Sequence, residues 1–173
     1  MIKKMLTFAL SICMIFAISA CGSSEENVDL NTDGILESIR EVYGEQYLCD
    51  TAIPEDILTG VFKINMDDVE QISTEMPVIG FHPDKVVIVK AKEGKVDLIE
   101  QGFMEAQTYY KNEAAMYPAN IAKVNASQII KQGDYIMFLL VGAPDDGTLT
   151  EEDALVFAKD ETQKAVDAVN ALF

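Results

Sequence analysis

Residues 85–91, Lys-Val-Val-Ile-Val-Lys-Ala, carry the clearest strand pattern in the chain. Their four consecutive β-branched residues lack the alternation of a strand with one face in water, so we expect both faces of this strand to be covered. The run Tyr-Ile-Met-Phe-Leu-Leu-Val at residues 135–141 is apolar without alternation as well. The sequence therefore predicts two interior strands, and with them a sheet at the centre of the fold.

Each interior strand has a predicted hairpin partner. Residues 71–80 form the first partner, joined through the turn residues Phe-His-Pro-Asp at 81–84. Residues 127–131 form the second partner, joined through Gln-Gly-Asp at 132–134. Two hairpins predict a sheet of about four strands, either antiparallel or mixed.

Short helical segments precede the first hairpin. Residues 34–43 have a helical period, with Asp33 in the capping position and Gly44 as the stop. A second short helix is predicted after Pro54, because proline is tolerated in a first turn. The buried face of the first helix is expected to carry three branched apolar residues, Ile35, Ile39 and Val42.

Two longer helical patterns complete the chain. The first covers residues 94–117, and the second follows Thr150, which is expected to cap its helix with Asp153 at the third position. The apolar stripe of the second helix is predicted at Leu155, Ala158, Val166, Val169 and Leu172. The order of helices and hairpins lacks the alternation of strand and helix in a doubly wound sheet. We therefore predict one α+β domain over residues 31–173, with the sheet packed against the two long helices.

The first 20 residues have the features of an export signal. Two lysines form a positive start, and residues 5–20 are apolar and uncharged. This stretch is shorter than the roughly 20 apolar residues that a membrane-spanning helix needs. Residues 22–27, Gly-Ser-Ser-Glu-Glu-Asn, then have the composition of a flexible tether. We predict a signal peptide at residues 1–20 and a tether at residues 21–30.

The last residues of this signal, Ile18-Ser19-Ala20 followed by Cys21, resemble the lipobox of bacterial lipoproteins. The resemblance implies that the Cys21 thiol receives a diacylglyceryl group and that a signal peptidase cuts before this residue. Two acyl chains hold a protein stably on a bilayer, whereas one gives marginal binding. The protein is then expected on the extracytoplasmic face of the cell membrane, anchored by lipid. The alternatives are an ordinary secretory signal with a coincidental cysteine, and an uncleaved anchor.

The chain is strongly acidic, with 29 aspartates and glutamates against 13 lysines and arginines and a net charge of −16. Loss of residues 1–20 removes two lysines and no acid, which takes the net charge to about −18. Such a surface repels nucleic acid and anionic headgroups, so we expect no nucleic-acid partner and no basic membrane patch. A small ligand is expected to be cationic or neutral. The alternative is that the acidity only keeps an exported domain soluble.

The sequence contains no recognisable catalytic constellation. His82 is the only histidine and lies in a proline-containing turn, where we expect it to be exposed. Cys49 is the one cysteine that remains after removal of the signal and lipidation of Cys21, so no intramolecular disulfide is expected and Cys49 is predicted to be a small buried residue. One histidine and one cysteine fall short of a zinc ligand set. We expect neither an enzyme nor a cofactor.

Residues 29–34, Asp-Leu-Asn-Thr-Asp-Gly, match the first six positions of an EF-hand calcium loop. The candidate ligands are Asp29, Asn31 and Asp33. Position twelve of the loop is Arg40, however, and this cation cannot bind calcium. The alternative is a polar tether that ends in a helix cap.

Two further groups of residues are candidates for a ligand site. Acidic residues at 145–146 and 151–153 surround Gly147 and could bind a divalent ion, although such acids commonly stay solvated beside a helix N-terminus. Tyr109, Tyr110 and Tyr117 could form an aromatic platform for a cation or a sugar. Core packing is the alternative for Tyr110 and Tyr117.

Three spaced segments carry a resemblance to a known family: residues 64–69 (Ile-Asn-Met-Asp-Asp-Val), 84–92 (Asp-Lys-Val-Val-Ile-Val-Lys-Ala-Lys) and 133–138 (Gly-Asp-Tyr-Ile-Met-Phe). With features between them, over about residues 35–141, they resemble the domain-of-unknown-function family 4358, found largely in lipoproteins of clostridia and their relatives. The resemblance implies a lipobox followed by this one domain, and it implies no assigned activity.

These observations lead to one leading hypothesis and one alternative. The leading hypothesis is a membrane-anchored lipoprotein whose domain is a non-enzymatic binding or interaction module, with another envelope protein as its candidate partner. The alternative is a surface module that binds a small ligand or calcium.

Overall fold

The computed structural model describes residues 30–79, 82–114, 118–145 and 147–173 of the chain. In this part of the chain a four-stranded sheet is formed by β1 (Val69–Glu75), β2 (Lys85–Ala91), β3 (Gln128–Gln132) and β4 (Tyr135–Leu140). The order across the sheet is β1-β2-β4-β3, and all neighbouring pairs are antiparallel. The two strands predicted to be interior, β2 and β4, are the central pair. Of the two sheet types expected, the antiparallel one is correct.

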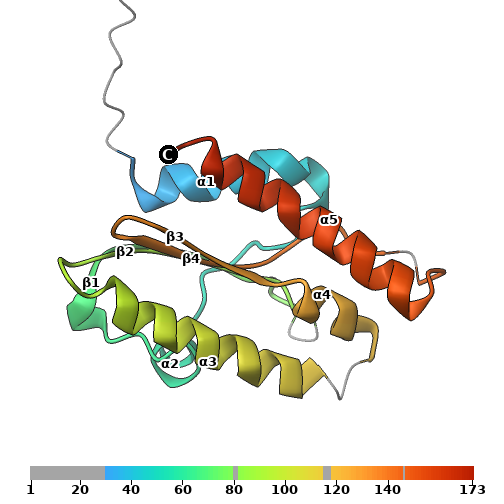
Figure 1. Cartoon of the computed structure of the whole chain (residues 1–173), viewed down its shortest axis with the longest axis horizontal. Coiled ribbons are helices and arrows are strands. Elements are labelled where there is room, and N and C mark those ends of the chain that lie inside the picture. Colours follow the sequence, from blue (N-terminus) through green and yellow to red (C-terminus); the bar gives the residue numbers. More distant parts are fainter. Residues whose placement is uncertain (1–29, 80–81, 115–117, 146) are drawn as a thin grey trace, which may run out of the picture.

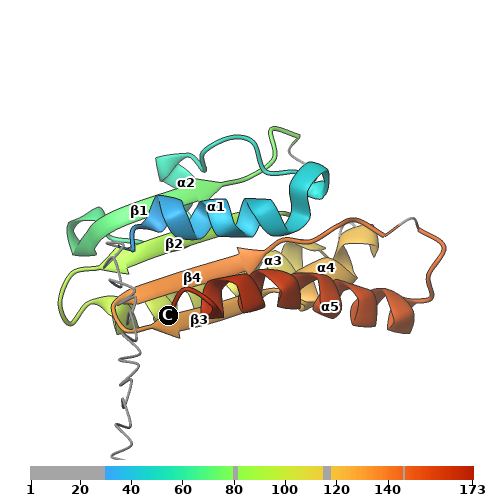
Figure 2. The same cartoon turned by 90° about the horizontal axis from the view of Figure 1, so that it is seen from above.

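Helices cover both faces of the sheet (Figure 1). On one face lie α1 (Thr32–Tyr43) and α5 (Glu151–Asn170), and on the other lie α3 (Val96–Ala114) and the short α2 (Glu55–Gly60). The short α4 (Ile121–Asn125) contacts both α3 and α5 at one end of the sheet (Figure 2). The other short elements are the 3-10 helices Gly44–Gln46, Met66–Asp68 and Pro118–Asn120. The predicted α+β domain with a sheet packed against two long helices is therefore confirmed, and α3 and α5 lie on opposite faces. Within the described part of the chain, none of the helices has the length and apolar character to cross a membrane.

The central strands are apolar throughout because both of their faces are buried. On β2, Val87 and Val89 face α3, whereas Val86 and Ile88 face α1 and α5. Burial of each such side chain stabilises the fold by about 1.5 to 3 kcal/mol. The same alternation continues along β4, with Ile136, Phe138 and Leu140 toward α3 and Met137, Leu139 and the following Val141 toward α1 and α5.

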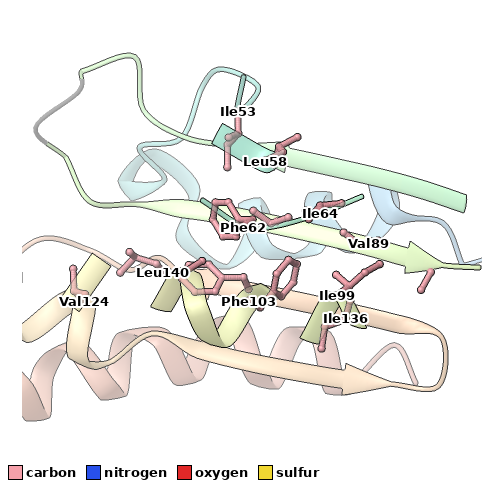
Figure 3. Close-up of a cluster of buried hydrophobic side chains, with 14 residues drawn as sticks. Ile53, Leu58, Phe62, Ile64, Val89, Ile99, Phe103, Val124, Ile136 and Leu140 are labelled. Atoms are coloured by element: carbon pink, nitrogen blue, oxygen red, sulfur yellow. The ribbon is translucent and has the colours of Figure 1, made fainter. Parts of the chain in front are cut away.

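Three phenylalanines pack together on the α3 side of the core (Figure 3). Phe138 of β4 packs edge-on against Phe62 and Phe103, with ring centroids 5.1 and 6.0 Å away. Phe62 and Phe103 are 5.7 Å apart in a similar arrangement. Such edge-to-face pairs add about 0.5 to 1.5 kcal/mol to the burial of the rings. Because Phe62 follows α2 in the chain, this contact attaches the segment before β1 to α3 and β4.

The N-terminal cap of α1 differs from the prediction. Asn31, and not Asp33, caps this helix, because its Oδ1 accepts a hydrogen bond from the Gly34 N–H at 2.8 Å. Asp33 lies in the first turn, where its carboxylate accepts a hydrogen bond from the Ser73 hydroxyl of β1. The helix therefore begins two residues earlier than predicted, with its first turn attached to the sheet.

The buried face of α1 also differs at its C-terminal end. Ile35 and Ile39 are fully buried as predicted, but Val42 is 40% exposed. Tyr43 takes the inner position instead, and its hydroxyl donates a hydrogen bond to the Glu161 carbonyl oxygen of α5 at 2.6 Å. Burial raises the pKa of the Tyr43 hydroxyl above its usual value, so the group stays a donor at neutral pH. The predicted stop at Gly44 is confirmed.

β1 ends at Glu75, several residues before the predicted end. Met76 then forms an isolated bridge with Thr51, and the chain leaves the sheet at Pro77. Proline has no N–H to donate, which makes it a natural end for an edge strand. The connection between β1 and β2 is therefore longer than the predicted four-residue turn.

The start of α5 agrees with the prediction and its end does not. The Thr150 hydroxyl accepts a hydrogen bond from the Asp153 N–H at 3.2 Å, which confirms the predicted cap. The helix ends at Asn170, so Leu172 is exposed and lies outside the buried stripe.

A substitution at Gly102 tests how closely α3 approaches the segment that contains Phe62. A Cβ atom there would overlap the Phe62 carbonyl oxygen, so Gly102→Ala is expected to lower the free energy of unfolding by about 1 to 3 kcal/mol. Where a helix position has free space, replacement of glycine by alanine usually raises the free energy of unfolding, by about 1 kcal/mol. Gly60→Ala in α2, where an added Cβ meets nothing within 4 Å, is the matched control. Urea unfolding measures both variants, and a Gly102→Ala protein as stable as the control would contradict the close approach.

Candidate functional site

Two depressions are lined by residues of α4, which lies at one end of the sheet in Figure 2. One encloses about 400 Å³, and its lining includes His82, Pro83 and Lys123. The other encloses about 470 Å³, and its lining includes Ile121, Leu149 and Leu155. The two depressions share four lining residues, Ala119, Ala122, Asp145 and Gly147, and we call the pair the α4–α5 hollow.

A buried carboxylate lies behind the polar part of this hollow. Asp84 is only 1% exposed, and its Oδ1 is 2.6 Å from the Lys123 Nζ and 3.5 Å from the His82 Nδ1. Among the described residues, the Oδ2 atom of Asp84 has no hydrogen-bond partner. A buried polar atom without a partner is uncommon in a folded protein and calls for an explanation. The described residues therefore satisfy the Asp84 carboxylate only in part.

Three segments of the chain bring these groups together. His82 and Asp84 belong to the segment before β2, and Lys123 belongs to α4. The Lys123 Nζ also donates a hydrogen bond to the Gly142 carbonyl oxygen, just beyond β4, at 2.6 Å. Lys85 of β2 pairs with Leu140 of β4, so the start of one central strand lies beside the end of the other. The Lys123 ammonium thus attaches α4 to the ends of both central strands.

Gly142 lets α5 close one side of the hollow. Its φ of +150° is a conformation that side chains disfavour, and a Cβ there would lie 2.8 Å from the Glu161 Cβ. Next to it, the Ala143 N–H donates a hydrogen bond to the Glu161 Oε2 at 3.2 Å. The backbone after β4 therefore runs directly against α5, and Ala143 and Ala158 both line the hollow.

Lys85 is a second buried cation near this end of the sheet. Its Nζ lies 4.8 Å from the centre of the Tyr110 ring and donates a hydrogen bond to the Pro83 carbonyl oxygen at 3.3 Å. Burial lowers the pKa of the Lys85 ammonium, and the neighbouring Asp84 opposes this shift. The ring of Tyr110 is part of the core on the α3 side, so Lys85 is held by packing and by a cation–π contact.

The predicted aromatic platform is only partly testable. Tyr109 is exposed, whereas Tyr110 packs into the core beside Phe62 with ring centroids 5.8 Å apart. Tyr117 lies outside the described residues. Tyr110 is partly buried and packs against the core, as the core-packing alternative predicts.

Two single residues, His82 and Cys49, were predicted to be exposed and buried respectively. His82 is only 22% exposed, because it lies beside Asp84 and forms part of the floor of the hollow. Cys49 is buried as predicted, and desolvation, followed by the negative charges of Asp84 and Glu75, raises the pKa of its thiol to about 12. A thiol with this pKa is protonated at neutral pH and is a poor nucleophile.

The candidate calcium ligands are engaged with the chain itself. Asn31 Oδ1 caps α1 and Asp33 Oδ1 accepts the Ser73 hydroxyl, while Asp29 lies outside the described residues. Of the acidic run near Gly147, Asp145 and Glu151 line the hollow. Over the described residues, no group of three or more histidine, cysteine, aspartate or glutamate side chains is placed to hold a metal ion. The calcium loop that includes Asp29 stays a prediction.

The fold defines the chain as a single-domain α+β protein with a hollow at one end of its sheet. It belongs to the family described as Domain of unknown function (DUF4358), whose model matches residues 47–141, more than half of the chain. The matched range contains all four strands together with His82, Asp84 and Lys123. No curated protein and no solved structure matched the chain. The resemblance inferred from the sequence is thereby confirmed at the level of the family.

The contact between Asp84 and Lys123 has no counterpart among the sequence predictions. Asp84 lies in a predicted turn, and Lys123 lies in a segment without a clear period. The one local indication of this contact is that Asp84 and Lys123 both lie next to apolar residues. A charged residue in such a place is expected to be paired if it is buried. Their 39-residue separation in the chain hides the pairing.

Lys123→Met tests the importance of this ion pair. The substitution leaves the Asp84 carboxylate buried without its counter-ion, so we expect the free energy of unfolding at pH 7 to fall by about 3 to 5 kcal/mol. Adding Asp84→Asn removes the second charge and should recover part of the loss. Lys159→Met on the exposed side of α5 is the control. If Lys123→Met unfolds at the same urea concentration as Lys159→Met, the pair does not hold α4 in place.

Proposed function

We propose that the protein is a lipoprotein on the extracytoplasmic face of the cell membrane, and that its domain is a non-enzymatic binding module with the α4–α5 hollow as its binding site. In this proposal the lipid on Cys21 provides the membrane attachment. The observation that carries it is the position of the hollow relative to the start of the domain. The short helix α4, whose residues line the hollow, and the start of α1 lie at opposite ends of the sheet (Figure 1, Figure 2).

The contacts along β4 define these two ends. At the start of β4, the Tyr135 hydroxyl donates a hydrogen bond to the Leu30 carbonyl oxygen, and the Tyr135 ring packs against Phe173 with centroids 5.4 Å apart. At its other end, Gly142 contacts Lys123 in the floor of the hollow. A strand of this length spans roughly 20 Å. A lipid tether that reaches the domain at Leu30 would therefore leave the hollow on the side away from the bilayer.

The chemistry of the hollow supports binding rather than catalysis. Lys123 is neutralised by Asp84, and the Cys49 thiol nearby is buried and protonated. Each of the two depressions has a volume within the roughly 300 to 1,000 Å³ that is usual for small-molecule sites. Most of the lining is apolar, with a few charged groups at defined positions, as is common in such sites. A small ligand, or one side chain of an envelope protein, has the size to fill it.

Cys21→Ser tests the membrane attachment. If the thiol of Cys21 carries the lipid, the variant incorporates no labelled palmitate and is found outside the membrane fraction. Cys49→Ala is the matched control, because Cys49 is buried and should leave both results unchanged. A Cys21→Ser protein that still incorporates palmitate and stays on the membrane would overturn the proposed anchor.

Ala119→Trp tests the hollow as the binding site. Ala119 is exposed and lines both depressions, so an indole at this position fills the hollow at little cost to the core. Native mass spectrometry of the lipidated protein purified from its own membranes is expected to show a bound small molecule on the wild type and none on this variant. Ala171→Trp, at the exposed C-terminal end of α5, is the control and should keep the ligand. Equal ligand occupancy in both tryptophan variants would place binding outside the hollow.

A further inference from the structure

Acidic groups outnumber basic ones around the α4–α5 hollow. Asp145 stands where the two depressions join, and Glu151 lines the more apolar of them. Among the described residues that line the hollow, Lys123 is the one with a permanent positive charge, and Asp84 compensates it at 2.6 Å. The first turn of α5 carries three acids, Glu151, Glu152 and Asp153, against the roughly half charge of its helix dipole. The hollow therefore keeps a net negative charge.

Asp84 lies behind the lining of the hollow, where it is paired with Lys123. Its Oδ1 faces two residues that line the hollow, so the carboxylate points toward the hollow. Its Oδ2 has no hydrogen-bond partner among the described residues and is buried, where charges act over a lower dielectric than in water. Because Lys123 already compensates the charge of Asp84, the net attraction for a positive group in the hollow comes from Asp145 and Glu151.

The wall beside the acids is apolar and accessible. Ile121 and Leu149 are each 41% exposed, and Leu155 of α5 lines the same depression. When a ligand covers exposed aliphatic side chains, binding becomes more favourable by about 25 cal/mol for each Å² of apolar surface that leaves water. The wall thus favours a compact apolar body next to the negatively charged groups.

We propose that the α4–α5 hollow takes a small organic cation, in which an ammonium group near Asp145 is carried by a compact apolar body that covers Ile121 and Leu149. This inference rests on the proposed function of the hollow as a binding site and adds the chemical class of its ligand. The ammonium supplies three N–H donors to carboxylate acceptors, and the apolar body displaces water from the wall. An anion of the same shape is repelled by the carboxylates of Asp145 and Glu151.

Three probe molecules of similar shape and different charge separate the contribution of the charge from that of the apolar contact. Cyclohexylammonium, cyclohexanol and cyclohexanecarboxylate are titrated into the full-length lipidated protein in nanodiscs of zwitterionic lipid, with empty nanodiscs as the blank. Saturation-transfer NMR gives each dissociation constant. Cyclohexylammonium is expected to bind about tenfold more tightly than cyclohexanecarboxylate at low salt, with the difference shrinking as ionic strength rises. Cyclohexanol is expected to lie between them.

Asp145→Asn is the variant that tests the position of the charge. It should weaken cyclohexylammonium binding about fivefold and leave cyclohexanol binding unchanged, because only the charged probe uses the carboxylate. Glu152→Gln is the matched control, since Glu152 belongs to the same acidic turn of α5 but does not line the hollow. Glu152→Gln should change the dissociation constant of each of the three probes by no more than about twofold.

The outcomes distinguish this inference from the proposed function. If cyclohexanol binds and Ala119→Trp abolishes its binding, but the three probes bind equally or the carboxylate binds best, the hollow remains a binding site and the cation preference is wrong. If none of the probes binds and Ala119→Trp also leaves the natural ligand in place, the proposed binding site and the cation preference are both wrong. A cation preference that is lost in Asp145→Asn and kept in Glu152→Gln supports both.

Discussion

The burial of the central pair β2 and β4 on both faces is the constraint on which the rest of the fold depends. Each of these strands hydrogen-bonds to a neighbour along both edges, and each places apolar side chains alternately on the two faces. A pair of this kind has no face that can be left to water, so a layer of helices on each side is required. α1 and α5 supply one layer, and α3 with α2 supplies the other. The edge strand β3, in contrast, keeps exposed polar residues such as Gln128 and Lys131.

The hollow follows from where this central pair ends. Beyond Leu140 and before Lys85 the apolar ladder stops, and the short α4 covers the end through the contact of Lys123 with Asp84 and Gly142. A buried ion pair adds little net stability compared with apolar residues of the same volume. A buried acceptor without a partner costs about 1 to 3 kcal/mol, and the Oδ2 of Asp84 has none within the part of the chain that the structure describes. Stability alone is therefore a weak reason for a carboxylate at this position, and a role in binding accounts for it better.

The parts of the fold that the sequence predicts are those decided within a few residues. The apolar run of β4 and the cap at Thr150 carry their own signals, and both are correct. Asn31 and Asp33 are equally good caps by local chemistry, and the choice between them is made by Ser73, a residue of β1 that bonds Asp33. The hollow could not be predicted in the same way, because its polar floor joins two turns and a short helix, none of which has a period to recognise. What the sequence does supply is the net charge that the hollow shares with the whole surface.

The proposed anchor, the acidity and the hollow are consistent with one another in physical terms. A tether of about ten residues reaches at most about 35 Å, so the domain stays near the bilayer, where electrostatic forces act over about 8 Å at physiological ionic strength. An anionic bilayer surface repels an acidic domain and favours orientations in which the end farthest from the tether points outward. Because Leu30 and the hollow lie at opposite ends, this repulsion presents the hollow to the surrounding solution. At that distance the potential of the bilayer surface is largely screened, so the preference of the hollow for a cation depends on its own carboxylates and not on the charge of the membrane.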